Sequence, residues 1–386
     1  MCNPLTVRAV VELDTVSDNE QKFTMRTTKE AQMAAISVAH SPKVVFARGA
    51  LSQIASEVTA LNKKRILLIS DESASSHVKK VNDALGSLIV QSVDHVVMHV
   101  PDEFSAPIVA SAQKNEIDLV ISIGGGSSTG LGKIVALDAQ IDLMAVPTTY
   151  AGSEMTTIWG RTRNNQKLTG RDMAVLAKTT IYDPELTYSL PLSISANSGM
   201  NAIAHAVEAL YAPDVTTEVH DAAIEGIEVI AKALPLLHAD IKDLQARDEL
   251  LRGSMLCGFS LSNATMGIHH KICHTLGGMF ELAHAPMHSA VLPWAVAYNL
   301  NFAQSQLSEV AKVLNAPNAD VGLWDLANKV GAQTSLKNIG YPLEKSEEVA
   351  DVISRATFVN PRPFDNQAVM DLLRNAYEGI RPNDES

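Results

Sequence analysis

The chain has 386 residues, of which 46% are hydrophobic and 19% charged, and its formal net charge is −12. This composition is typical of a folded globular protein, and the chain is long enough for two domains. The negative charge argues against a nucleic-acid partner and a membrane partner, because both need a basic face. Three cysteines are too few for a disulfide framework or a zinc cluster, so we expect a cytoplasmic location, with a mitochondrial address left open.

The first 41 residues are interpreted as an N-terminal extension, with one possible strand at "LTVRAVVEL" (Leu5–Leu13). From residue 42 onward, short β-rich runs alternate with amphipathic stretches such as "ALSQIASEVTALN" and "SAPIVASAQKN". The predicted strands are 44–46, 65–70, 95–100, 118–126 and 142–149. This alternation predicts a parallel sheet with helices on both faces, and we assign residues 42–190 to an α/β dinucleotide-binding domain.

After Pro191 the strand signal ends and apolar residues recur with helical spacing, as in 225–241, 246–264 and 349–358. We therefore assign residues 191–386 to an all-helical domain that carries substrate-binding and catalytic residues. A ligand cleft is expected where the two domains meet.

A glycine-rich segment, "ISIGGGSSTGLGK", follows a predicted strand and begins a helix. Gly124, Gly125 and Gly126 allow a close approach of the backbone, and Ser127 offers a hydroxyl and an amide. The first turn of a helix binds anions, so the pyrophosphate of a dinucleotide is the predicted occupant. The spacing matches neither the G-x-G-x-x-G fingerprint nor a Walker A loop, and a tight turn without a ligand is the alternative.

Polar side chains follow two other strands at the same predicted sheet edge. Asp71 directly follows "RILLIS", at a place where a carboxylate could accept hydrogen bonds from an adenosine ribose or simply cap a helix. Thr148, Thr149 and Ser153 follow the strand at 142, either as turn residues or as cofactor contacts. Together with the glycine turn, these residues favour a nicotinamide dinucleotide site.

Histidines are concentrated in "GIHHKICHTLGGMFELAHAPMH", which holds five of the twelve in the chain: His269, His270, His274, His284 and His288. Each alone is explained as a core or solvated residue. As a group, and with His205 on an Ala-rich helix, they indicate a functional site. His205, His270 and His284 could bind a transition metal, or they could donate hydrogen bonds to an oxyanion or a carboxylate.

The residue at position 201 bears on this choice. Asn201 lies four residues before His205, so both side chains share one helix face. An Asp there would lower the charge of a divalent metal site, whereas the Asn amide is neutral and also carries a donor. We expect a much weakened metal affinity.

These segments resemble the iron-containing alcohol dehydrogenase superfamily and, within it, the maleylacetate reductases. The resemblance covers about residues 42–382 and rests on "GGGSSTGLGK", "VPTTYAGSEMT", "TGRD", "IYDPELT", "SGMNAIAHAVEALYA", "HHKICHTLGG", "VLPWAVAYN" and "NPRPF". It implies the fold of that superfamily, which is similar to that of dehydroquinate synthase. It also implies a homodimer.

In metal-dependent members an Asp and three His bind Fe²⁺ or Zn²⁺, at positions that match Asn201, His205, His270 and His284. Maleylacetate reductases carry the Asn and are regarded as metal-free, which is the expectation here. By the same resemblance His274 lies near the nicotinamide, and further cofactor contacts fall on residues 124–127, Thr148, Thr149 and Lys167. Asp71 matches a carboxylate linked to a preference for NADH, with NADPH possible.

The resemblance implies reduction of maleylacetate to 3-oxoadipate, late in the catabolism of aromatic compounds. We expect a histidine donor cluster around the enolate oxygen or a carboxylate, with Lys271 as a carboxylate clamp or a solvated lysine. Tyr150 is a further candidate acid. Pro286 and Met287 replace the Glu-Thr usual in the family and are expected in the substrate pocket region, and Trp294 replaces a His, so a related unsaturated oxo acid is also a candidate substrate.

Three other functions stay open at this point. The first is a metal-dependent alcohol or aldehyde oxidoreductase in which Asn201 serves as a weak ligand. The second is a non-redox biosynthetic enzyme on the same scaffold, and the third is a binding protein that has kept the site.

Overall fold

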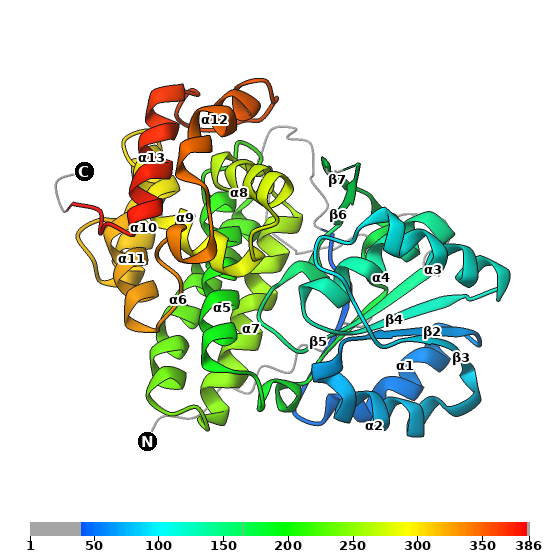
Figure 1. Cartoon of the computed structure of the whole chain (residues 1–386). Coiled ribbons are helices and arrows are strands. Elements are labelled where there is room, and N and C mark those ends of the chain that lie inside the picture. Colours follow the sequence, from blue (N-terminus) through cyan, green and yellow to red (C-terminus); the bar gives the residue numbers. More distant parts are fainter. Residues whose placement is uncertain (1–39, 165, 384–386) are drawn as a thin grey trace, which may run out of the picture. The chain divides into compact units, whose positions relative to one another are not determined.

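The computed structural model describes residues 40–164 and 166–383 (Figure 1). The strand predicted for Leu5–Leu13 lies outside the described residues. Six parallel strands form one sheet in the order β1-β8-β5-β4-β2-β3. Their bounds are β1 Lys43–Phe46, β2 Ile66–Ser70, β3 Ile89–Val93, β4 Leu119–Gly124, β5 Asp142–Pro147 and β8 Thr179–Tyr182.

Helices cover both faces of this sheet, as predicted. Along β2, Leu68 points to the side of α1 (Ile54–Ala60) and α2 (Ser75–Leu85), and Leu67 points to the side of α3 (Asp102–Lys114) and α4 (Gly126–Ala139). Figure 1 shows the two helix pairs on opposite faces. Since successive side chains of a strand alternate between faces, a strand covered on both sides is largely apolar, as the first four residues of "ILLIS" are.

The strand predicted for residues 95–100 is wrong. The strand in this region is β3, and residues 94–100 contain no strand. Val96 and Val100 instead pack into the apolar cluster between the sheet and helices α3 and α4. β3 was missed because it lies at the sheet edge, where its side chains alternate between half-buried and exposed.

Three further strands were missed. β8 is short and begins with two threonines, so its apolar signal is weak. β6 (Ile158–Arg163) and β7 (Gln166–Arg171) form a separate antiparallel hairpin, and its turn includes Asn164 with a positive φ of 50°. Polar residues dominate this hairpin, and it carries Lys167.

After residue 190 the described chain contains helices and no strands, which confirms the fold class. The domain boundary itself stays a prediction. The helices are α5 Leu192–Leu210, α6 Thr217–Ala239, α7 Leu244–Ser262, α8 Ile268–Phe280, α9 His284–Asn299, α10 Gln304–Leu314, α11 Ala319–Lys329, α12 Ser346–Ser354 and α13 Asn366–Glu378. Short 3₁₀ helices occupy 50–53, 72–74, 86–88, 153–155, 173–175, 184–187, 337–339 and 343–345.

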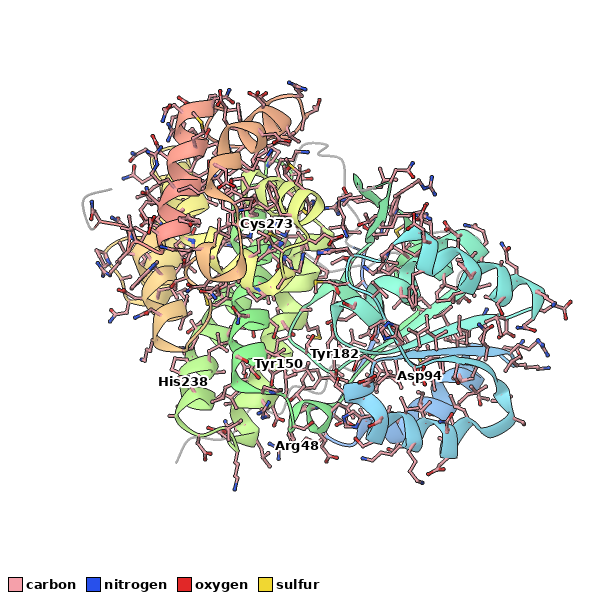
Figure 2. The ribbon with its side chains drawn as sticks, in the orientation of Figure 1. Arg48, Asp94, Tyr150, Tyr182, His238 and Cys273 are labelled. Atoms are coloured by element: carbon pink, nitrogen blue, oxygen red, sulfur yellow. The ribbon has the colours of Figure 1, made fainter. Side chains whose placement is uncertain are left out.

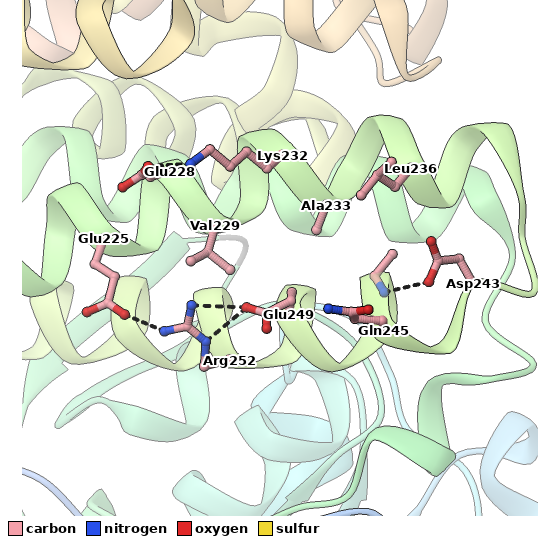
Figure 3. A pocket seen from close by; sticks show the side chains of 11 residues that line it. Glu225, Glu228, Val229, Lys232, Ala233, Leu236, Asp243, Gln245, Glu249 and Arg252 are labelled. Carbon is pink, nitrogen blue, oxygen red and sulfur yellow. Dashed lines mark hydrogen bonds and ion pairs between the residues drawn. The ribbon is translucent and has the colours of Figure 1, made fainter. Parts of the chain in front are cut away.

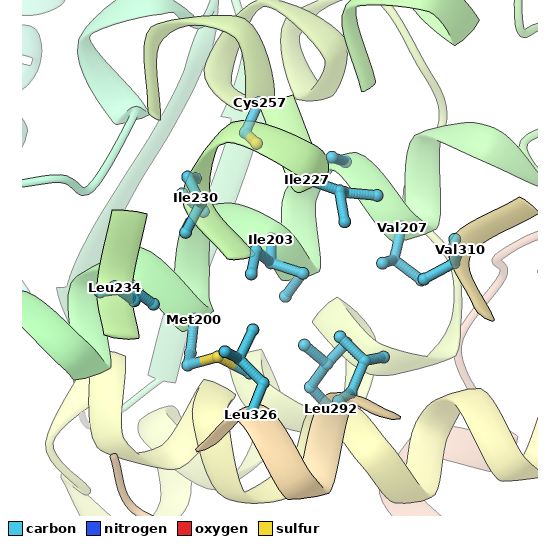
Figure 4. Packing of buried hydrophobic residues seen from close by; sticks show 14 of the residues in the cluster. Met200, Ile203, Val207, Ile227, Ile230, Leu234, Cys257, Leu292, Val310 and Leu326 are labelled. Carbon is cyan, nitrogen blue, oxygen red and sulfur yellow. The ribbon is translucent and has the colours of Figure 1, made fainter. Parts of the chain in front are cut away.

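Helix α5 lies at the centre of the helical region. Its residues Met200, Ile203 and Val207 pack against apolar side chains from α6, α7, α9, α10 and α11, as Figure 4 shows. Alanines and a glycine at other positions of α5 let its neighbours approach closely; a Cβ at Gly199 would lie 3.1 Å from Leu234. The polar residues of α5 are therefore held on a rigid, buried element.

No helix among the described residues is long and apolar enough to span a membrane. A surface hollow of about 440 Å³ lies between α6 and α7 and is lined by charged residues such as Glu225, Glu249 and Arg252 (Figure 3). None of the predicted site residues lines this hollow.

Candidate functional site

The glycine turn and the hydroxyl-rich loop lie next to each other at the carboxyl edge of the sheet. β4 pairs with β5 so that Gly124 is opposite Pro147, and the Gly124 carbonyl accepts a hydrogen bond from the Thr148 amide at 3.0 Å. The Thr149 side chain packs against Gly125, where a Cβ would lie 3.0 Å from its methyl group. The structure thus brings together the segments for which the sequence predicts cofactor binding.

Asp71 lies beside Gly124 in this turn. Gly124 has a φ of +144°, and a Cβ on it would lie 2.5 Å from Asp71 Oδ2. The carboxylate accepts hydrogen bonds from the Ser128 hydroxyl at 3.2 Å and from Ser73, and it does not cap the 3₁₀ helix that follows it. Only glycine can occupy position 124 without displacing Asp71.

Helix α4 begins at Gly126 and Ser127, so its first backbone N–H groups face this edge of the sheet. Farther along α4, the buried Lys133 ammonium donates to three backbone carbonyls, of Ser153 (2.7 Å), Thr156 (2.7 Å) and Ile158 (2.8 Å). Burial lowers the pKa of Lys133 to about 7. Sequence reasoning did not identify Lys133, which fixes the loop after Ser153 onto the candidate cofactor helix.

Asn201 and His205 lie on α5, as predicted, and approach the loop after β5. The Asn201 Nδ2 atom lies 3.2 Å from His205 Nε2 and 3.4 Å from the Ala151 carbonyl oxygen. His205 Nδ1 in turn lies 2.9 Å from Nε2 of His270 on α8. The three side chains are buried and connected in one row.

Glu208 extends this row and was not singled out from the sequence. Its Oε2 lies 2.6 Å from His270 Nδ1, and the carboxylate also accepts the backbone amides of Gly267 and His269. Its position, seven residues after Asn201 and three after His205, places it on the same face of α5. That spacing, together with Glu208 being the acidic residue of this Ala-rich helix, was the available sequence signal.

His274 and His284 are more accessible than this row. His284 is exposed at the first position of α9, and His274 is half-buried on α8, one turn after His270. Neither ring has a hydrogen-bond partner among the residues that the structure describes. The surrounding protein desolvates both rings and lowers their pKa, so both are neutral at pH 7.

Two half-buried lysines lie near these rings. Lys167 on β7 donates weakly to the His99 carbonyl at 3.4 Å, and burial lowers the pKa of its ammonium to about 8. Its charge contributes to the lowered pKa of both His274 and His284. Lys271 on α8 also has a lowered pKa because of burial, and in the described part of the chain it has no acidic partner.

His99 is a second residue that sequence reasoning missed. Its backbone has a φ of 63° and that of Val100 a φ of 48°, and a β-branched residue rarely adopts such a value. The ring packs near Gly277, and its Nε2 is buried without a partner in the described structure. A hollow of about 340 Å³ opens between His99 and Gly278, both of which contact Lys167.

Tyr150 is not brought together with the histidines. It is completely buried in the apolar cluster around α5, and its hydroxyl accepts a hydrogen bond from Arg247 at 3.3 Å. Burial raises its pKa. Figure 2 shows Tyr150 near Tyr182 and away from Cys273, which lies on α8 within the histidine run. Met287 is likewise buried, in the core of the helical region, so it does not line an accessible pocket.

The residues expected to bind a metal in related proteins do not fit an ion as they are arranged here. His205 and His270 direct ring nitrogens at each other, and Asn201 turns its amide nitrogen toward His205. Among the described residues, the histidine, cysteine and carboxylate atoms that converge within 4.8 Å of one another belong to His269, Cys273 and His288 instead.

This second group does not fit an ion well either. The outer ring nitrogens, His269 Nδ1 and His288 Nε2, are buried without partners among the described residues. Metal-bound histidines almost always donate their second N–H to an acceptor. The contact of 3.0 Å between His269 Nε2 and His288 Nδ1 is an ordinary hydrogen bond.

Comparison with known proteins agrees with this fold. The family model for iron-containing alcohol dehydrogenase matches residues 41–184, and the model for the C-terminal part of the Fe-containing alcohol dehydrogenase family matches residues 195–377. The maleylacetate reductase of Burkholderia cepacia is 44% identical over 345 residues, covering 89% of this chain and 98% of that protein.

Solved structures give the same result. A putative alcohol dehydrogenase from Ralstonia eutropha JMP134 has a TM-score of 0.88 at 41% identity, covering 91% of this chain and 100% of that one. A maleylacetate reductase from Agrobacterium tumefaciens has a TM-score of 0.85 at 37% identity, with the same coverage. The fold and the family matches define an oxidoreductase with a six-stranded parallel sheet and a histidine-lined helical region. The chain belongs to the iron-containing alcohol dehydrogenase family, and its resemblance to maleylacetate reductases is confirmed.

Proposed function

We propose that this reductase uses NADH to reduce maleylacetate, or a similar unsaturated oxo acid, without an obligatory metal ion. The observation that supports the metal-free part is the row Asn201–His205–His270–Glu208, in which a neutral amide faces His205 and the ring nitrogens of His205 and His270 face each other. The substrate class is supported by the similarity to maleylacetate reductases over 89% of the chain.

The cofactor is proposed to bind at the glycine turn. The N-terminus of α4 supplies backbone donors for a pyrophosphate, and Thr149 and Ser153 extend the polar surface. Asp71 accepts ribose hydroxyls and repels a 2′-phosphate, which favours NADH over NADPH. When bound, the reduced nicotinamide supplies the hydride, and the protein supplies orientation and electrostatics.

The acceptor carbon becomes electrophilic when negative charge on the neighbouring carbonyl oxygen is stabilised. His205 and His270 form their hydrogen bonds within the row. Of the three histidines expected from the sequence to donate to the oxyanion, only His284 is therefore left for that role. We assign the donor role at the oxyanion to His284, with His274 positioned to orient the nicotinamide or pass a proton. Lys167 is proposed to bind a substrate carboxylate, and Lys271 is a second candidate for this role.

A cytoplasmic homodimer is the proposed form of the protein. The described cysteines, Cys257 and Cys273, are buried free thiols, which fits a reducing compartment. The homodimer rests on the family resemblance, and light scattering of the purified protein tests it.

The decisive experiment measures NADH oxidation with maleylacetate and a panel of unsaturated oxo acids, alcohols and aldehydes. We expect turnover with one or more oxo acids that survives exhaustive chelation, with less than stoichiometric metal by elemental analysis. Loss of activity on chelation, restored by Fe²⁺ or Zn²⁺, would contradict the metal-free reaction and favour a metal-dependent alcohol or aldehyde oxidoreductase. Failure to oxidise NADH with every oxo acid would contradict the proposed substrate class.

A further inference from the structure

The ammonium of Lys133 is enclosed by oxygens of a single segment. Lys133 lies two turns after Gly126 on α4, with 2% of the residue exposed. Its Nζ donates to the carbonyl oxygens of Ser153 (2.7 Å), Thr156 (2.7 Å) and Ile158 (2.8 Å) and to the Thr156 hydroxyl (2.8 Å). We call these four atoms the oxygen cage. An ammonium has three N–H groups and no lone pair, so four acceptors use all of its donors.

The oxygen cage needs a cation at its centre. Carbonyl oxygens carry partial negative charge, and three of them that converge on one point repel one another unless a positive group lies between them. Burial disfavours the charge of Lys133 and lowers its pKa, while the Glu154 carboxylate raises it. Oxygens at hydrogen-bond distance replace the water that burial removes. The ammonium therefore does here what a bound monovalent ion does at a cluster of backbone carbonyls.

The segment that forms the cage has little regular structure of its own. Between β5 and β6 the described chain contains one 3₁₀ turn, at 153–155. Within the segment, the Thr156 hydroxyl donates to the Ser153 carbonyl at 2.9 Å and accepts the Ile158 amide at 3.2 Å. These bonds involve the same residues that face Lys133, so the ammonium joins an already folded turn to α4.

Candidate ligand-binding features lie on both sides of the cage along the chain. Before it comes the loop 148–153, which carries Thr149 and begins with a hydrogen bond from the Thr148 amide to the Gly124 carbonyl at 3.0 Å. After it the chain continues directly into the β6–β7 hairpin, which carries Lys167. The loop is thus tied to β4 at its start and to α4 at its end. These are the strand and the helix that flank the proposed pyrophosphate site.

We propose that Lys133 is a positioning residue whose ammonium acts as a built-in cation and fixes the loop 148–153 and the start of the β6–β7 hairpin against α4, in the geometry that binds the dinucleotide. The anchoring of the loop does not depend on the proposed function, whereas the effect on NADH binding rests on it. Because all of its donors are used in the cage, Lys133 acts through the positions of Thr149 and Ser153.

The test removes the ammonium or one oxygen of the cage. Lys133→Met removes every donor, and Lys133→Gln keeps two N–H groups but loses the charge. Thr156→Val removes one cage oxygen together with its two bonds inside the segment, and Thr156→Ser restores all three contacts. Thr179→Val is the matched control, because the Thr179 hydroxyl on β8 is equally buried but has no partner among the described residues.

The first readout is hydrogen–deuterium exchange measured by mass spectrometry without cofactor or substrate. The peptide that spans 150–160 should exchange at least about 10-fold faster in both Lys133 variants and in Thr156→Val, and at the wild-type rate in Thr156→Ser and Thr179→Val. Strand β2 is the internal reference and should not change, because one segment loosens and not the whole fold. Wild-type exchange of this peptide in Thr156→Val, or in a folded Lys133 variant, would overturn the anchoring role, whether or not the enzyme reduces maleylacetate.

The second readout is NADH affinity, titrated through the fluorescence of the bound cofactor well below the thermal midpoint of each variant. The Kd should rise about 10-fold in Lys133→Gln and about 3-fold in Thr156→Val, and stay within about 1.5-fold of wild type in Thr156→Ser and Thr179→Val. Faster exchange of the segment together with wild-type NADH affinity would overturn the positioning role. A wild-type protein that does not bind NADH would instead contradict the proposed cofactor, and the exchange measurements would still test the cage.

Discussion

The histidines of the site fall into two groups that differ in access to solvent. The inner group, His205, His269, His270 and His288, is buried, and its rings hydrogen bond to one another or to Glu208. The outer group, His274 and His284, is reachable and has no hydrogen-bond partner among the described residues. Histidines that lie close together can thus have different roles: some support the site structurally and others act on the substrate. Whether a ring already has a hydrogen-bond partner within the protein distinguishes the two roles.

The largest expected effect comes from removing a ring of the outer group. Replacing His284 with Ala should lower kcat/KM by about 10²-fold or more, because a donor to the developing oxyanion is lost. The melting temperature should change little, since His284 lies at the exposed first position of α9 and its ring has no hydrogen-bond partner among the described residues. Steady-state NADH oxidation and thermal unfolding of the same preparation test this, and wild-type kinetics would remove His284 from the mechanism.

Removing an inner ring should show the opposite pattern. His288→Asn deletes the hydrogen bond to His269 and leaves space in the core, so the free energy of unfolding should fall by about 1–3 kcal/mol. The kcat should stay within about 5-fold of wild type. Urea unfolding measures the loss, and a stable but inactive variant would show that the two groups are not functionally distinct.

A smaller effect is expected at the lysines. Lys167→Gln should raise the KM for a dicarboxylate substrate by about 10-fold, because a charge-assisted hydrogen bond is lost in a half-buried place. Lys271→Gln is the matched control, with a change of less than about 3-fold. A larger rise in KM for Lys271→Gln than for Lys167→Gln would indicate that Lys271 binds the carboxylate.

The smallest effect concerns pH. Burial lowers the pKa of His288, so the folded protein binds fewer protons there than the unfolded chain, whose histidines titrate near pH 6.5. The unfolding free energy should therefore fall as the pH drops below 6.5. His288→Asn should reduce that slope by about 1 kcal/mol per pH unit. Urea unfolding at pH 7.0 and 5.5 measures both slopes, and an unchanged slope would contradict a neutral buried His288.

The sequence predicted the fold class well because the central strands are continuous apolar runs. It misplaced the strand after α2 because an apolar segment, 95–100, packs without forming a strand, while the real edge strand is only half-buried. The β6–β7 hairpin was missed because the pattern of a solvent-facing hairpin is mostly polar. These errors arise where tertiary packing, rather than local hydrophobicity, decides the structure.

The candidate site was predicted in part. Helical spacing correctly paired His270 with His274 and His284 with His288, since each pair lies one turn apart. The role of Glu208 could not be read from α5 alone, because its partners are amides and a ring of α8, 59 to 62 residues later. Tyr150 was drawn into the prediction by its place beside Thr149, yet its hydroxyl belongs to the core.

The short turn that contains Ala151 is too closely packed to accept larger side chains at its glycine contacts. Gly152 has a φ of +75°, and a methyl group on Gly258 of α7 would overlap the Gly152 carbonyl oxygen. Backbone meets backbone there, so efforts to widen the substrate range should leave this pair of glycines intact. Even an alanine at 258 would push the Gly152 carbonyl away and shift the neighbouring Ala151 carbonyl, which contacts Asn201. The damage would reach the reaction through a position that touches no ligand.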